Sequence, residues 1–125
     1  PVFCTWSGQP IKDKDDLAID HAIPFSVLFN NDFWNLLPAK NAVNAKKTDK
    51  ILSNTQLLAS KNRILTAWQQ YLQTPELADT FASQCQISLS KAPNFTPEDL
   101  LVKFQEINLG FIEFRGMESW GWGEI

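Results

Sequence analysis

Residues 17–24 read LAIDHAIP, a short apolar run that carries one carboxylate and the only histidine of the 125-residue chain. Its length, its apolar character and its terminal proline are typical of a strand that ends near residue 24. On an extended backbone, Asp20 and His21 point to opposite faces. They can serve one site only if the strand ends there, as Pro24 predicts.

The first fifty residues around this run predict a small unit of strands and loops. Short apolar stretches are separated by turn-forming segments such as 7–10 (SGQP), 12–16 (KDKDD) and 30–32 (NND). Residues 33–37 (FWNLL) are expected to form a further strand, closed by Pro38, and residues 39–47 are expected to form a helix.

The remaining seventy-five residues have a helical pattern. Ser53, Pro75 and Pro97 stand where helices would begin, and Gly110 is placed to end the last one. The sequence therefore predicts an α+β protein with two parts, a β-rich core at residues 1–50 and a helical extension at 51–125 that packs on it. Because the chain begins with proline, we expect it to be a fragment of a larger protein.

Composition restricts the classes of protein to consider. The apolar fraction of 44% and the charged fraction of 20% are typical of a globular domain, and no apolar run is long enough to cross a membrane. Two cysteines, Cys4 and Cys85, are far apart in sequence and belong to no Cys-x-x-Cys pair. We expect them to be buried apolar side chains in a reducing, cytoplasmic setting, without a structural zinc site.

Net charge is −3, yet residues 39–63 hold six basic side chains and a single acid, Asp49. This cluster follows directly on the run that contains His21, where a polyanion would have to bind. A solvated helix face would give the same pattern. As phosphate contacts we expect four of its lysines: Lys40, Lys46, Lys47 and Lys50.

A single histidine with nearby carboxylate and amide groups is suited to phosphodiester hydrolysis. Neutral imidazole is the side chain best able to take a proton from water near neutral pH, so His21 is the candidate general base. Oxygen atoms of Asp20 and Asn44 would suit Mg²⁺ or Mn²⁺. Asn35 could orient the imidazole through a hydrogen bond, and Lys47 could contact phosphate as a point charge.

Four segments in this order resemble the HNH endonuclease family: 4–8 (CTWSG), 19–26 (IDHAIPFS), 35–38 (NLLP) and 44–47 (NAKK). The core of the second segment is most similar to the branch found in CRISPR effector nucleases and bacterial restriction or defence nucleases. The resemblance covers about residues 3 to 50.

The resemblance implies a ββα-metal fold, two antiparallel strands and a helix around one divalent ion. It matches Asp20 and Asn44 to the metal ligands, His21 to the general base and Asn35 to the middle Asn of the family name. Many members also bind a structural zinc through two Cys-x-x-Cys pairs. Here Ser7 stands in the place of one cysteine and the second pair is missing, so packing must stabilise the core.

We therefore expect a metal-dependent endonuclease domain that hydrolyses DNA, double-stranded DNA being the expected partner. Sequence specificity is expected from a fused or partner domain, because basic residues that contact phosphate do not read bases. Two alternatives remain open. One is a nucleic-acid-binding module of the same fold without catalysis, and the other is a ribonuclease or toxin nuclease of that fold.

Overall fold

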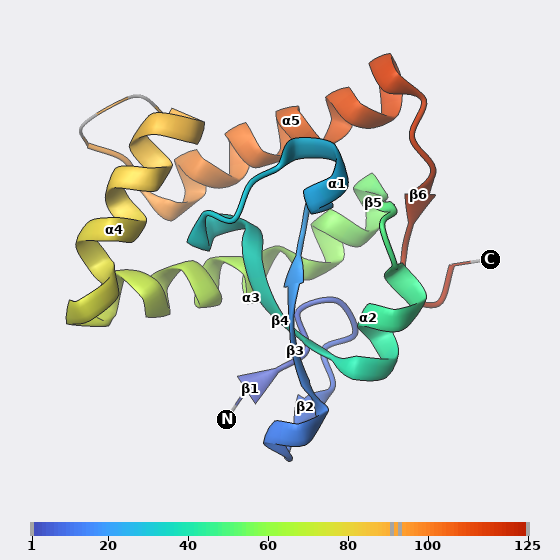
Figure 1. Cartoon of the computed structure of the whole chain (residues 1–125). Helices are drawn as coiled ribbons and strands as arrows, with labels where there is room; N and C mark the ends of the chain where they lie inside the picture. The colour runs from blue at the N-terminus through green and yellow to red at the C-terminus, as the bar shows by residue number, and fades with distance from the viewer. Residues whose placement is uncertain (1, 91, 93, 125) are drawn as a thin grey trace.

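The computed structural model describes residues 2–90, 92 and 94–124. Short strands occupy the first part of the chain and long helices the rest (Figure 1). The α+β class expected from the sequence is confirmed. Pro1 and Ile125, the outer limits of the two expected parts, lie outside the described residues.

A β-hairpin and a short helix form the centre of the first part. Strand β3 (Leu17–His21) pairs antiparallel with β4 (Leu36–Lys40), so that His21 lies opposite Leu36. Helix α2 (Asn41–Lys47) follows β4 directly and packs against both strands. This is the ββα order that the resemblance implies, and it brings the end of β3 close to α2 (Figure 1).

The strand expected at residues 33–37 differs from the structure. Phe33–Asn35 forms a 3₁₀ turn (η2), and β4 begins only at Leu36 and continues through Pro38 to Lys40. Proline is tolerated here because β4 belongs to a two-stranded sheet, in which an N–H is not needed on its outer side. The carbonyl of Pro38 is still used, since it accepts hydrogen bonds from the backbone N–H and the hydroxyl of Thr5.

Four small elements surround the hairpin. Strands β1 (Val2–Phe3) and β2 (Pro10–Ile11) pair antiparallel with each other, and the 3₁₀ turn η1 (Lys14–Asp16) leads into β3. After β3, the single-turn helix α1 (Phe25–Leu28) begins the loop that returns to β4.

Three long helices follow: α3 (Asn54–Gln73), α4 (Pro75–Cys85) and α5 (Pro97–Arg115), with a π-helical turn at Gln86–Ser90 (η3) after α4. The predicted starts are confirmed. The Ser53 hydroxyl caps α3, Pro75 occupies the first turn of α4, and Thr96 with Asp99 forms a capping box before α5.

The predicted end of the last helix at Gly110 is wrong, because α5 continues to Arg115 and ends at Gly116. Gly116 has the left-handed conformation (φ 61°) that closes helices through backbone bonds to the preceding turn. The chain then forms β6 (Ser119–Trp120), which pairs in parallel with β5 (Ile51–Leu52).

Side chains of the helices satisfy backbone groups of the first part of the chain. Trp68 Nε1 donates to the carbonyl of Trp34, Tyr71 donates to Leu36, and the buried Gln56 amide donates to Trp6. Trp34 and Trp68 also pack around Phe104 of α5 within one continuous apolar core. The first part of the chain is thus packed against α3 through β4 and against α5 through Trp34 of η2.

Both cysteines are free and fully buried in this core. Burial and the nearby Asp32 carboxylate raise the pKa of the Cys85 thiol to about 12. No helix among the described residues is long and apolar enough to span a membrane.

Candidate nuclease site

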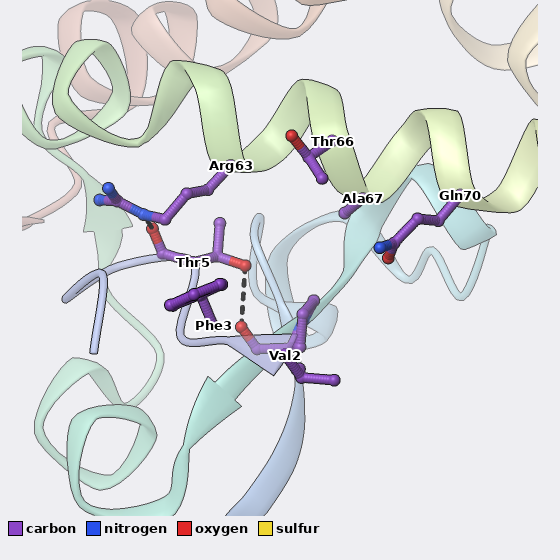
Figure 2. Close-up of a pocket in the computed structure, with 8 residues that line it drawn as sticks. Val2, Phe3, Thr5, Arg63, Thr66, Ala67 and Gln70 are labelled. Atoms are coloured by element: carbon purple, nitrogen blue, oxygen red, sulfur yellow. Dashed lines mark hydrogen bonds between the residues drawn. The ribbon is translucent and has the colours of Figure 1, made fainter. Parts of the chain in front are cut away.

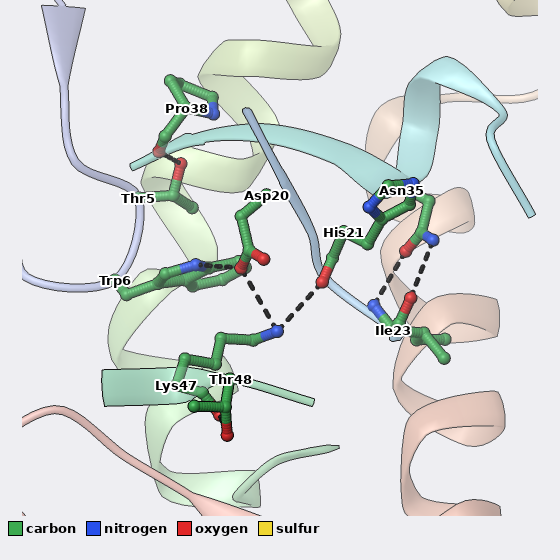
Figure 3. A network of polar contacts seen from close by, with 9 residues as sticks. All are labelled: Thr5, Trp6, Asp20, His21, Ile23, Asn35, Pro38, Lys47 and Thr48. Atoms are coloured by element: carbon green, nitrogen blue, oxygen red, sulfur yellow. Dashed lines mark hydrogen bonds and ion pairs between the residues drawn. The ribbon is translucent and has the colours of Figure 1, made fainter. Parts of the chain in front are cut away.

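Asp20 lies near the end of β3 with its side chain turned inward (Figure 3). It is 6% exposed, and its Oδ2 accepts a hydrogen bond of 2.8 Å from Trp6 Nε1. The same oxygen lies 3.2 Å from Lys47 Nζ. Both contacts fall on one oxygen, so the other carboxylate oxygen has no hydrogen bond to any described residue.

Lys47 was expected to contact phosphate, and the structure places it elsewhere. Its side chain is fully buried, with Nζ ion-paired to Asp20 and donating to the carbonyl of His21 at 2.9 Å. Its ammonium also lies 6.0 Å from the centre of the Trp6 ring. The physical reason is position, since Lys47 is in the last turn of α2 on the face that packs against β3.

Burial dominates the electrostatics of this ion pair. Desolvation raises the pKa of the Asp20 carboxyl, and the charge of Lys47 and the Trp6 hydrogen bond offset part of that rise. Desolvation likewise lowers the pKa of Lys47, against the attraction of Asp20. Each charge is therefore tolerated in this position mainly because the other is present.

His21 is the last residue of β3 and is partly exposed. Its Nε2 lies 2.7 Å from Oδ1 of Asn31, an exposed side chain in the loop before η2. An amide oxygen only accepts, so this contact places the proton of neutral imidazole on Nε2. Nδ1 then carries the lone pair that a general base needs.

Asn35 was expected to orient the imidazole, but the structure gives that contact to Asn31. The fully buried Asn35 amide instead accepts from the backbone N–H of Ile23 at 2.8 Å and donates to the carbonyl of Ile23 at 2.9 Å (Figure 3). It also donates to the carbonyl of Asn30. Asn35 therefore fixes both ends of the loop that follows His21.

We predict that Asn35→Ala lowers the free energy of unfolding by about 2 kcal/mol, because it leaves buried backbone groups of Ile23 without partners. Denaturant unfolding followed by circular dichroism measures the change. Asn31→Ala is the matched control, since Asn31 is exposed and its loss should change stability by less than about 0.5 kcal/mol. Equal stability of the two variants would contradict this role.

Asn44 lies on α2 one turn before Lys47, and residues three apart share a helix face. Since Lys47 reaches Asp20, we expect Asn44 to face the end of β3 as well. Its side-chain amide makes no hydrogen bond to a described residue. The available groups are thus one carboxylate oxygen and one amide oxygen, hard donors that fit Mg²⁺ or Mn²⁺.

The described part of the chain contains no group of three or more His, Cys, Asp or Glu side chains that could hold a metal ion. A cation held by Asp20 and Asn44 would therefore keep most of its ligand positions for water or substrate, which is the usual arrangement for Mg²⁺.

The other three candidate lysines remain at the surface with weak partners. Lys40 lies 3.6 Å from Asp16 and Lys50 lies 3.7 Å from Glu118. The ammonium of Lys46 lies over the Trp122 ring, 5.2 Å from its centre. Exposed pairs of this kind contribute little to stability, so the lysines can exchange them for phosphate at small cost.

A pocket of about 230 Å³ lies beside this region, between β1 and α3 (Figure 2). Its lining includes Phe3, Arg63 and Gln70 but neither Asp20, His21 nor Asn44. The candidate residues therefore lie outside this pocket, at the end of β3 and on α2.

Sequence reasoning missed two residues of the site. Trp6 belongs to the segment 4–8 of the family resemblance, and its indole N–H donates to Asp20. Asn31 was part of a turn-forming run, and no signal in the sequence connected it to His21. Each contact joins a residue of β3 to a residue in a loop. The spacing of residues along the chain does not predict the geometry of a loop.

Comparison with known proteins agrees with this geometry. A family model described as HNH endonuclease matches residues 4–52, which include β3, β4 and α2. No curated protein and no solved structure matches the chain. The matched segment contains Asp20, His21, Asn35 and Asn44 in the places just described. Residues 4–52 of this chain are therefore similar to the HNH endonuclease family.

Proposed function

We propose that this chain is a divalent-metal-dependent endonuclease domain that hydrolyses DNA phosphodiester bonds, with His21 as the general base. The observation that carries the proposal is the end of β3, where a buried, doubly held Asp20 precedes a partly exposed His21 bound to Asn31. The family match over residues 4–52 supports nuclease activity.

His21 would take a proton from the attacking water on Nδ1. Asn31 keeps the proton of the neutral ring on Nε2, and it stabilises the charged ring after proton transfer because Nε2–H remains a donor. Asn35 holds the loop on which Asn31 lies through its bonds to Ile23 and Asn30. Positioning of the base is thus divided between two asparagines.

Asp20 and Asn44 would hold the divalent cation. When bound, it would supply positive charge to offset the charge that develops on the phosphate and on the leaving 3′ oxygen. Trp6 and Lys47 fix the orientation of the Asp20 carboxylate by binding its Oδ2. Lys47 also holds the backbone of His21 through the carbonyl oxygen, so one side chain positions both neighbours.

Lys40, Lys46 and Lys50 would contact the phosphates on either side of the cut. They lie at the surface of β4, α2 and the segment that follows it, and such contacts fix position without reading sequence.

We also propose that residues 51–125 support the nuclease core in place of a structural zinc, and that a fused or partner domain selects the target.

Cleavage of supercoiled plasmid tests the proposal. We expect nicked or linear product with Mg²⁺ or Mn²⁺ and none with EDTA. Asp20→Asn and Asn44→Ala should each lower the rate by on the order of 100-fold, because each removes an oxygen that the cation needs. Asn41→Ala is the matched control on the same helix, and its rate should stay within about twofold of wild type.

The alternatives predict different results. Full activity of Asn44→Ala in Mg²⁺ would contradict the assigned ligand set. Metal-dependent cleavage of RNA but not DNA would favour a ribonuclease of this fold. Tight binding of DNA without cleavage by the wild-type chain, with or without either metal, would favour a binding module.

A further inference from the structure

Two phenylalanines beside His21 are exposed to solvent. Phe25 begins α1 and is 42% exposed, and Phe29, at the end of that turn, is 74% exposed. Their ring centres are 5.7 Å apart in an edge-on arrangement, and the Phe25 ring is also 5.7 Å from that of His21. The three rings form a row that begins at the candidate base.

Packing of the protein does not account for these rings. The apolar contacts that α1 makes with the core come from Val27 and Leu28, whose side chains are partly buried. Phe29 also has a left-handed backbone (φ 53°, ψ 39°), which favours glycine or asparagine and is strained for a phenylalanine. A strained backbone that presents an apolar ring to water indicates a functional role.

The chain segment that carries the pair is uncharged. Residues 22–31 contain no charged side chain. The nearest acid along the chain, Asp32, has its Oδ2 bound by Trp34 Nε1 at 2.9 Å and by the Ser88 hydroxyl at 2.7 Å. The pair can therefore attract a ligand by stacking and apolar contact, and it has no charge with which to bind a phosphate.

We propose that the Phe25–Phe29 pair is a stacking surface for an unpaired nucleobase next to the phosphodiester that is cut. This inference rests on the proposed function, which puts the phosphate at His21. The faces of paired bases are covered in duplex DNA, whereas a single strand or an unpaired nucleotide offers a face to an aromatic ring. The site then takes single-stranded or locally unpaired nucleic acid in preference to intact duplex.

Binding of a base can be separated from binding of phosphate. Fluorescence anisotropy of the wild-type chain in EDTA compares a labelled 16-nucleotide thymidine strand with a strand of equal length made entirely of abasic sites. Both strands carry the same charge. We expect about tenfold tighter binding of the thymidine strand, the size of a base–aromatic stacking contribution. A 16-base-pair duplex should also bind more weakly than the thymidine strand.

Substitution of Phe29 by two different residues distinguishes a ligand site from a structural role. Phe29→Asn removes the ring and suits the left-handed backbone, so the melting temperature should not fall, while the preference for bases should drop to within about twofold. Phe29→Trp keeps an aromatic face and should keep the preference. If Phe29 had only a structural role, Phe29→Asn would lower the melting temperature and leave the preference for bases unchanged.

Three results would overturn the inference. One is equal binding of the two strands by the wild-type chain, and another is an unchanged preference in Phe29→Asn. The third is a dimer, seen by sedimentation, that Phe29→Asn dissociates, which would make the pair an interface between copies. Cleavage in Mg²⁺ is measured separately. Preference for bases without cleavage overturns the nuclease proposal and supports the stacking surface.

Discussion

His21→Ala should lower the rate of metal-dependent plasmid cleavage by 100-fold or more, up to about 10⁴-fold, the range that a positioned general base contributes. The chain has no second histidine that could take over the proton, so little activity should remain. Initial rates of nicking at saturating Mg²⁺, measured for both proteins at equal concentration, give the ratio directly.

The substitution should leave the fold intact. The His21 side chain is partly exposed and contacts the exposed Asn31 and Phe25, whereas the bond to Lys47 comes from its backbone carbonyl and survives the change. A melting temperature close to wild type is therefore the control. Asn31→Ala should show a smaller loss of about tenfold, because the base remains and only its tautomer and orientation are released. Activity of His21→Ala within about threefold of wild type would contradict the assignment.

The sequence was sufficient for the local elements. Hydrophobic pattern, a proline at the end of a run and capping residues act over a few neighbours, so the starts of α3, α4 and α5 were predicted correctly. Gly110 was misjudged because a glycine inside a helix is tolerated where packing on both sides continues, and the αL closure lies at Gly116.

Contacts between segments far apart in the chain were not predictable in the same way. The order and spacing of Asp20, His21, Asn35 and Asn44 pointed to one site through family resemblance. The hydrogen bonds of Asp20 and His21 depend on where the loops place Trp6 and Asn31. No local sequence pattern predicts those positions. The burial of Lys47 was missed for a related reason, since a lysine in a basic cluster is ordinarily solvated and only the pairing with Asp20 keeps it inside.

Replacement of Lys47 should have the largest effect on stability. Lys47→Met keeps much of the apolar stem but leaves the 6%-exposed Asp20 without its counter-ion and the His21 carbonyl without a donor. Removing one partner of a buried pair costs about 3–5 kcal/mol, a large share of the stability of a small domain. Urea unfolding at neutral pH measures the loss against wild type.

Lys46→Met is the matched control, because Lys46 is the exposed neighbour on the same helix. Its stability should change by less than about 0.5 kcal/mol, and its affinity for DNA should fall. If Lys47→Met does not fold, the double variant Asp20→Asn with Lys47→Met provides the answer. It contains no unpaired charge and should recover at least half of the loss. The opposite result would be a Lys47→Met variant with unchanged stability and weakened DNA binding. Lys47 would then contact phosphate, as the sequence first suggested. Its ion pair with Asp20 would have to open when substrate binds.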